Sequence, residues 1–156
     1  MIEMCQRDFE KSQDKQKMFE FFSPWIKYCL GETNSYVIPE SLNFFIIFNK
    51  YFPGFLAVSM KDFFDNVERF ISFGVYGINE HCIKIFLMMF EDKKLYSQTF
   101  NEFMKLLIKS SSIKVYKFIQ ELIIALLNKN LLQENYIKLL FERIITIYST
   151  INKNND

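Results

Sequence analysis

The sequence predicts an all-α protein built as an α-solenoid, in which antiparallel helical hairpins stack in a row. Three observations favour this fold class. Half of the residues are apolar and 18% are aromatic, while Gly (4) and Pro (3) are scarce, which favours long helices over a many-turned β fold. Apolar residues recur at helical spacing along most of the chain. Short polar turns at residues 31–35, 74–77 and 109–112 each end one helical pattern and directly precede another.

The three turns recur at intervals of roughly 40 residues, which is a period typical of stacked helical hairpins. We therefore expect one domain over residues 1–156, with about seven helices. Hairpins are expected over about residues 16–130, followed by a terminal apolar helix over residues 132–151. A compact helical bundle is the alternative, because the length, helix content and composition suit it as well.

Four helices are expected in the first part of the chain. The first covers residues 16–30, or begins instead at Ser23 as N-cap with Pro24 in its first turn. The second begins near Ile38 and ends before Pro53 and Gly54. A loop at residues 57–59 precedes the third helix, over residues 61–73, and the fourth covers residues 79–90.

Three more helices follow. Thr99 and Glu102 have the spacing of a capping box, although this fifth helix could already start at Ser97. Ser112 is expected to cap the sixth helix, and Asn130 could cap the seventh together with Gln133. Apolar residues nearly encircle the seventh helix, so we expect another chain, further repeats or a central place in a bundle to cover it.

Charge and cysteine content narrow the classes of protein that fit. The 19 basic residues nearly balance the 18 acidic ones, so no broad cationic surface is expected for nucleic acid or an anionic membrane. No apolar run reaches the roughly 20 residues of a membrane span. Met1 is followed by charged residues rather than by a signal peptide, and the three cysteines have no metal-ligand spacing. These features predict a cytoplasmic protein with reduced thiols.

The residues needed for catalysis are sparse. His81 is the only histidine, and its neighbour Cys82 would point about 100° away from it on a helix. One histidine and scattered cysteines do not make a metal site, and four glycines do not form a phosphate-binding loop. We therefore expect no enzyme activity, no metal and no cofactor.

Three segments carry a resemblance to a known family. The hexapeptide at residues 32–37 reads Glu-Thr-Asn-Ser-Tyr-Val, residues 86–91 form an apolar run closed by Glu91, and a polar turn precedes a long apolar helix over residues 109–126. Over about residues 16–130 the chain resembles TOG domains, the tubulin-binding family of HEAT-type solenoids. It differs in that Trp25 lies in a helical pattern rather than in a turn, and that the turn at residues 74–77 has no basic residue.

The resemblance implies a scaffold that binds tubulin through the turns inside its hairpins and associates with the cytoskeleton. The implied contacts are Thr33, Asn34, Ser35, Val37, Tyr76, Lys109 and Lys114. Each also has an ordinary structural interpretation, such as helix capping for Asn34 and Ser35 or a solvated helix surface for the lysines. Two alternatives remain open: a generic HEAT-like adaptor in a larger assembly, or a viral helical bundle that inhibits cell-death or innate signalling.

Overall fold

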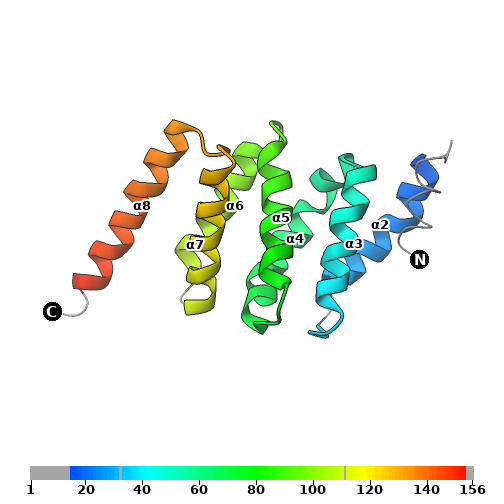
Figure 1. Ribbon diagram of the computed structural model, residues 1–156, viewed down its shortest axis with the longest axis horizontal. Coiled ribbons are helices and arrows are strands. Elements are labelled where there is room, and N and C mark those ends of the chain that lie inside the picture. Colours follow the sequence, from blue (N-terminus) through cyan, green and yellow to red (C-terminus); the bar gives the residue numbers. More distant parts are fainter. Residues whose placement is uncertain (1–14, 32, 111, 154–156) are drawn as a thin grey trace. The chain divides into compact units, whose positions relative to one another are not determined.

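A computed structural model describes residues 15–31, 33–110 and 112–153 of the chain. These residues form seven α-helices and no strand, which confirms the all-α prediction for this part of the chain (Figure 1). The helices are α2 (Lys15–Gly31), α3 (Ile38–Tyr51), α4 (Gly54–Phe73), α5 (Ile78–Glu91), α6 (Tyr96–Lys109), α7 (Ile113–Asn128) and α8 (Glu134–Lys153). The chain divides into two compact units, Met1–Ile85 (unit 1) and Phe86–Asp156 (unit 2), and the boundary falls inside α5.

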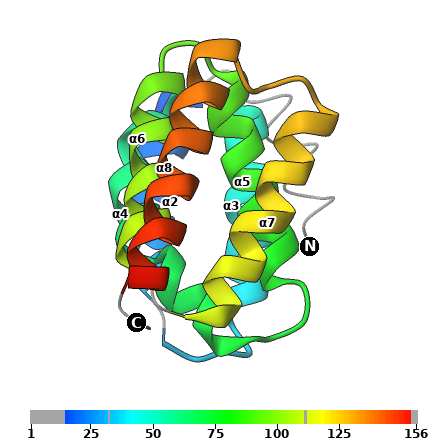
Figure 2. The same ribbon diagram turned by 90° about the vertical axis from the view of Figure 1, so that its left-hand side faces the viewer.

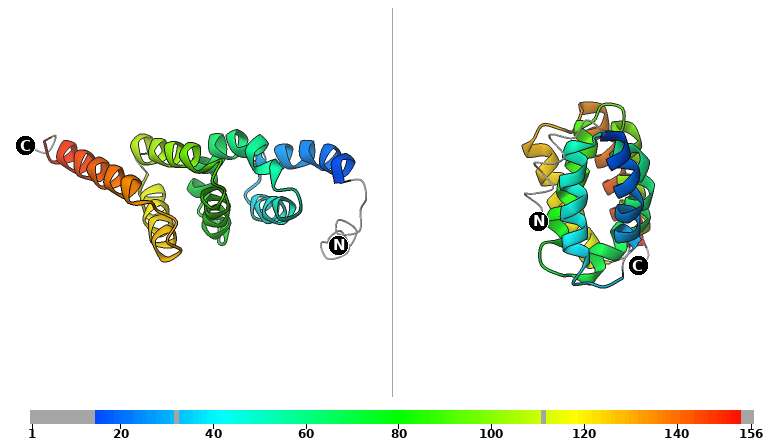
Figure 3. Two further views of the ribbon diagram at one scale, coloured as in Figure 1. Left: turned by 90° about the horizontal axis from the view of Figure 1, so that it is seen from above. Right: turned by 90° about the vertical axis from the view of Figure 1, so that its right-hand side faces the viewer.

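In unit 1, α2 packs against both α3 and α4, and the three helices lie beside one another (Figure 3). Phenylalanine rings fill the space between them. The Phe48 ring lies 4.6 Å from that of Phe52 and 5.1 Å from that of Phe55, and Phe19 of α2 contacts all three. Such ring pairs add about 0.5–1.5 kcal/mol each beyond the burial of their area, so this cluster stabilises the unit.

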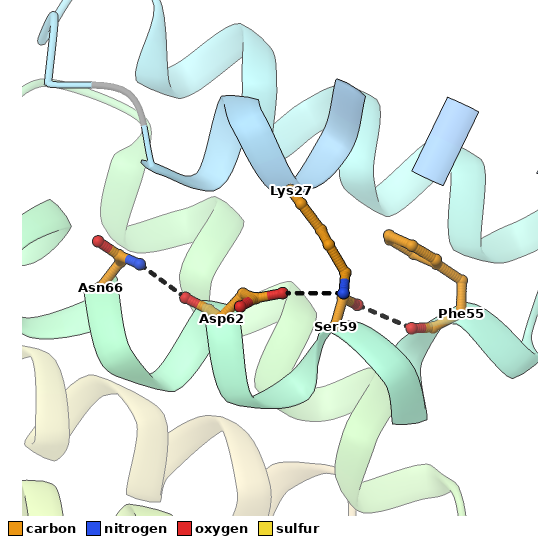
Figure 4. Close-up of polar contacts among 5 residues, drawn as sticks. All are labelled: Lys27, Phe55, Ser59, Asp62 and Asn66. Carbon is orange, nitrogen blue, oxygen red and sulfur yellow. Dashed lines mark hydrogen bonds and ion pairs between the residues drawn. The ribbon is translucent and has the colours of Figure 1, made fainter. Parts of the chain in front are cut away.

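Polar contacts along α2 and α4 support the same packing. Lys27 Nζ of α2 lies 3.6 Å from Asp62 Oδ2 of α4 (Figure 4). Both side chains are partly exposed, so this ion pair contributes only about 0–1 kcal/mol. Arg69 Nη2 donates a 3.0 Å hydrogen bond to the carbonyl of Leu30, in the last turn of α2. That bond satisfies a carbonyl that has no partner within its own helix, and it places positive charge at the negative end of the helix dipole.

Unit 2 pairs each helix with the helix two positions along the chain. Phe86 of α5 contacts Phe118 of α7 at 5.8 Å between ring centroids, and Glu91 forms a 3.1 Å ion pair with Lys129, directly after α7. Tyr136 of α8 packs on Phe100 of α6 at 4.5 Å. The Tyr96 hydroxyl, at the start of α6, fastens the connection between α7 and α8. It donates to the Leu131 carbonyl at 2.8 Å and accepts from the Gln133 N–H at 3.2 Å.

In unit 1, the predicted helix over residues 16–30 is confirmed against the alternative start at Ser23, and the loop predicted at residues 57–59 is wrong. Helix α2 continues through Pro24 instead of starting at Ser23, because Phe19 packs in the aromatic cluster before that point and Ile26 and Leu30 are buried after it. Helix α4 begins at Gly54, so the loop expected at residues 57–59 is helical. Ser59, which suggested that loop, is fully buried and donates its hydroxyl to the Phe55 carbonyl at 2.7 Å (Figure 4).

In unit 2, the predicted N-cap position of Ser112 is confirmed, while the caps predicted at Thr99 and Asn130 differ from those observed. Thr99 does not cap α6 but lies buried inside it, donating its hydroxyl to the Leu95 carbonyl at 2.8 Å. Ser112 stands at the predicted N-cap of α7 without a side-chain capping bond. Asn130 closes α7 instead of starting α8, since its φ of 53° is left-handed. The bonds from Asn130 N to Leu127 O and from Leu131 N to Leu126 O are those of a Schellman motif.

Candidate protein-binding edge

The turn at residues 33–37 holds its tyrosine outward by local hydrogen bonds. Asn34 Oδ1 accepts from the Tyr36 N–H at 3.0 Å, while the Asn34 carbonyl accepts from the N–H groups of Val37 and Ile38. These bonds form an Asx turn that leads directly into α3. The Tyr36 side chain is 87% exposed and Val37 is 41% exposed, so an aromatic and a β-branched side chain project from this turn.

The turn at residues 74–77 depends on two glycines. Gly74 and Gly77 have φ values of 66° and 86°, in the region that favours glycine. The Gly77 carbonyl accepts from the His81 N–H at 3.0 Å and from His81 Nδ1 at 2.6 Å, so the histidine stabilises the start of α5. Tyr76 stands between the glycines and is 98% exposed.

Both turns lie at the same end of unit 1, opposite to the turn between α3 and α4 (Figures 1 and 2). They bring Tyr36 and Tyr76 to one edge, together with the predicted residues Thr33, Asn34, Ser35 and Val37. We call this set the tyrosine edge. Tyrosine is enriched among the residues that contribute most to protein interfaces because its ring is large, rigid and amphipathic. An edge with two almost fully exposed tyrosines can therefore act as a docking surface.

The other predicted residues fall elsewhere. Lys109 ends α6 and Lys114 lies in the first turn of α7, both in unit 2 and both exposed. The turn between them is closed by a 3.2 Å hydrogen bond from the Ser112 N–H to Ser110 Oγ. Glu32, the first residue of the hexapeptide, lies outside the described residues. The structure thus places five of the seven predicted contacts in one unit and two in the other.

Sequence reasoning missed Tyr36 as a candidate contact. The hexapeptide resemblance drew attention to Thr33, Asn34, Ser35 and Val37, whereas Tyr36 occupied one of its variable positions. The available signal was the parallel with Tyr76, since both tyrosines stand in short turns that contain residues able to adopt unusual backbone conformations.

The cysteine side chains that were considered for catalysis lie in different environments. Cys82 is fully buried, and burial raises the pKa of its thiol far above the usual range, so the thiolate is strongly disfavoured. Cys29 is partly exposed, and Cys5 lies outside the described residues. Among the described residues there is no group of three or more His, Cys, Asp or Glu side chains that could hold a metal ion. No helix in the described ranges has both the length and the apolar content to cross a bilayer.

Comparisons with family models, curated proteins and solved structures find no match to this chain.

Proposed function

We propose that the chain is a non-enzymatic scaffold of stacked helical hairpins that binds a protein partner through its tyrosine edge. The stacked arrangement is supported by three contacts between a helix and the helix two positions along: α2 with α4, α5 with α7 and α6 with α8. In helical-repeat scaffolds, the turns and concave surfaces serve as binding surfaces.

The exposure of Tyr36 and Tyr76 at one end of unit 1 carries this proposal. The turn of Tyr36 is held by the hydrogen bonds of Asn34, and the turn of Tyr76 by the bonds of His81 to the Gly77 carbonyl, so the backbone at both tyrosines is ordered before a partner binds. Preorganised aromatic anchors raise affinity because less conformational entropy is lost. Neither tyrosine contributes to the apolar core, which leaves their rings available to a partner.

Tubulin is the partner we propose, on the resemblance of residues 32–37 and 109–126 to TOG domains. Lys109 and Lys114, which lie in unit 2, would make a separate basic contact with an acidic partner surface. Such a role would place the protein in the cytoplasm with the cytoskeleton. A generic adaptor that binds another protein through the same edge is the second candidate, favoured by the uncharged character of the turn at residues 74–77.

Co-sedimentation of the full chain with microtubules, together with a binding titration on free tubulin, tests the proposal. Replacing both tyrosines, Tyr36→Ala with Tyr76→Ala, should weaken binding at least tenfold, because truncating an interface anchor costs more than about 1–2 kcal/mol. Reversing the charge of Lys109 and Lys114 to glutamate should weaken it further and reduce its salt dependence.

Tyr28→Ala is the matched control, since Tyr28 is 71% exposed in the same unit but lies on α2 rather than in a turn. Binding by the wild type that is unchanged in the double tyrosine variant would exclude the tyrosine edge as the site. Absence of wild-type binding to either form of tubulin would exclude tubulin and leave the adaptor.

A further inference from the structure

Helix α7 has apolar residues on two opposite faces. Val115, Phe118 and Leu122 are fully buried on the face that packs against α5. Because successive residues of a helix are turned by about 100°, the other apolar residues of α7 form a second stripe on its opposite side. This stripe contains Ile113, Tyr116, Ile124 and Leu127, which are 85%, 38%, 50% and 47% exposed. An ordinary surface helix is apolar on one face alone, so the second stripe needs its own explanation.

Helix α8, which follows α7 in the chain, also has exposed apolar residues. Near its start, Tyr136 contacts Tyr96 and Phe100, and Leu140 is buried. Beyond that point Phe141, Ile144 and Ile145 are 59%, 37% and 63% exposed. Within unit 2, α7 and α8 run in opposite directions (Figure 2). The exposed apolar residues of the two helices form what we call the α7–α8 face: Ile113, Tyr116, Ile124, Leu127, Phe141, Ile144 and Ile145.

The exposed apolar residues of this face are numerous. Each of its seven apolar side chains is more than a third exposed. A contiguous apolar patch larger than a few hundred Å² is uncommon on a monomeric soluble protein and marks an interaction site.

The charged residues at the border of the face indicate which partner fits. On α7, Lys117 and Glu121 stand four residues apart beside the exposed stripe. On α8, Lys138 and Glu142 have the same spacing and the same order of charge beside Phe141 and Ile145. When a helix packs antiparallel against a copy of itself, each such lysine comes alongside the glutamate of the copy. The border is therefore complementary to itself.

We infer that the α7–α8 face binds a second copy of this chain, forming a twofold symmetric dimer. A twofold axis that lies in the interface and crosses both helices near their middles sets α7 on α7 and α8 on α8, each pair antiparallel. The apolar residues then form the core of the interface. The two lysine–glutamate pairs form its polar rim, in the arrangement usual for protein interfaces.

The dimer is tested with the full chain by sedimentation equilibrium and by light scattering on a sizing column. The wild type should have twice the mass of one chain and dissociate on dilution. Ile124→Glu combined with Phe141→Glu should raise the dissociation constant at least a hundredfold, because charged groups would be buried without partners. Both positions are at least half exposed, so circular dichroism should show an unchanged helix content.

A charge exchange tests the symmetry. Lys117→Glu alone should weaken the dimer about five- to tenfold, since at two places in the dimer it sets a glutamate opposite Glu121 of the other copy. Adding Glu121→Lys should restore the affinity. Val58→Glu, at a 54% exposed position on α4, is the control and should leave the dissociation constant unchanged.

Two outcomes overturn the inference. A wild type that stays monomeric at every concentration would mean that further helices or an unrelated partner cover the face. Assemblies that grow beyond the dimer with concentration would mean head-to-tail packing, which has no twofold axis. Both results are independent of the tyrosine edge, which lies in unit 1.

Discussion

Unit 1 and unit 2 hold their helices together in different ways. Unit 1 relies on a cluster of phenylalanine rings shared by α2, α3 and α4, with Phe48 and Phe55 fully buried at its centre. Unit 2 fixes α8 near its start, by the Tyr96 hydroxyl and by the ring of Tyr136. The later residues Phe141 and Ile145 remain exposed. Unit 1 thus buries a ring cluster against one side of α2 while Phe21, Trp25 and Tyr28 of that helix stay exposed, whereas α8 is anchored near its start and exposes apolar residues along its later turns.

Removing a central ring of unit 1 should have the largest effect. Phe48→Ala should lower the free energy of unfolding by about 3–5 kcal/mol, because it removes a fully buried ring and leaves a cavity among Phe19, Phe52 and Phe55. Urea denaturation followed by circular dichroism measures this loss. Phe21→Ala, at a 66% exposed position on α2, should change stability by less than about 0.5 kcal/mol. Equal losses for the two variants would mean that the ring cluster does not stabilise unit 1.

Removing the Tyr96 hydroxyl should have an intermediate effect confined to unit 2. Tyr96→Phe keeps the ring but leaves the Leu131 carbonyl and the Gln133 N–H without their partner, which should lower stability by about 1–2 kcal/mol. Hydrogen exchange should increase first in residues 131–140, where the clamp holds α8. Tyr116→Phe, which alters a tyrosine on the outer stripe of α7, serves as the control. Faster exchange spread evenly over both units would argue against a local clamp.

The same hydroxyl gives this prediction a pH dependence. Burial raises the pKa of Tyr96 above its ordinary value of 10.0. Above pH 10 the unfolded chain therefore loses this proton before the folded protein does. The stabilisation is complete below the unfolded pKa and is lost as the pH rises through the folded pKa. Tyr96→Phe should remove this part of the alkaline decline.

Changes at the turn of residues 74–77 should have the smallest effect on stability. Gly77→Ala should destabilise unit 1 by about 1 kcal/mol, because alanine is strained at a φ of 86°. An added Cβ would lie 3.7 Å from the His81 ring, an ordinary contact, so the penalty is one of backbone conformation. Gly54→Ala is the matched comparison. A Cβ added at Gly54, at the start of α4, would have no atom within 4 Å, so this variant should stabilise the protein by about 0.5–1 kcal/mol. Thermal denaturation of both variants measures the two changes in stability, which should have opposite signs.

Helical periodicity was enough to predict the number of helices in the described part of the chain and most of their boundaries. It predicted the starts of α3 and α7 to the residue, since Ile38 and Ser112 follow polar turns. It was wrong where one residue type serves two roles. Ser59 and Thr99 were interpreted as a loop residue and a cap, but each hydroxyl bonds to the carbonyl four residues earlier and so fits inside a helix. Asn130 was interpreted as a start signal, but asparagine also tolerates the left-handed conformation that ends a helix.

The candidate site was less accessible to sequence reasoning than the fold. Periodicity separates buried from exposed positions on a helix, but it does not say how far a turn residue projects. Tyr36 and Tyr76 were therefore recognisable as turn residues, while their near-complete exposure required coordinates. Likewise, the apolar residues of α8 were predicted to need cover, but only the structure separates Leu140, which is buried, from Phe141 and Ile145.

Most polar side chains inside this protein form their bonds within their own helix. Ser41, Asn49, Ser59 and Thr99 are buried, and each donates to the backbone carbonyl four residues earlier. Replacing the hydroxyl of Ser41, Ser59 or Thr99 by a hydrogen or methyl group would leave no group of a neighbouring helix without a hydrogen-bond partner. Such positions can therefore drift independently during evolution, without a compensating change elsewhere. Substitutions at these four positions should therefore leave the contacts between helices in place.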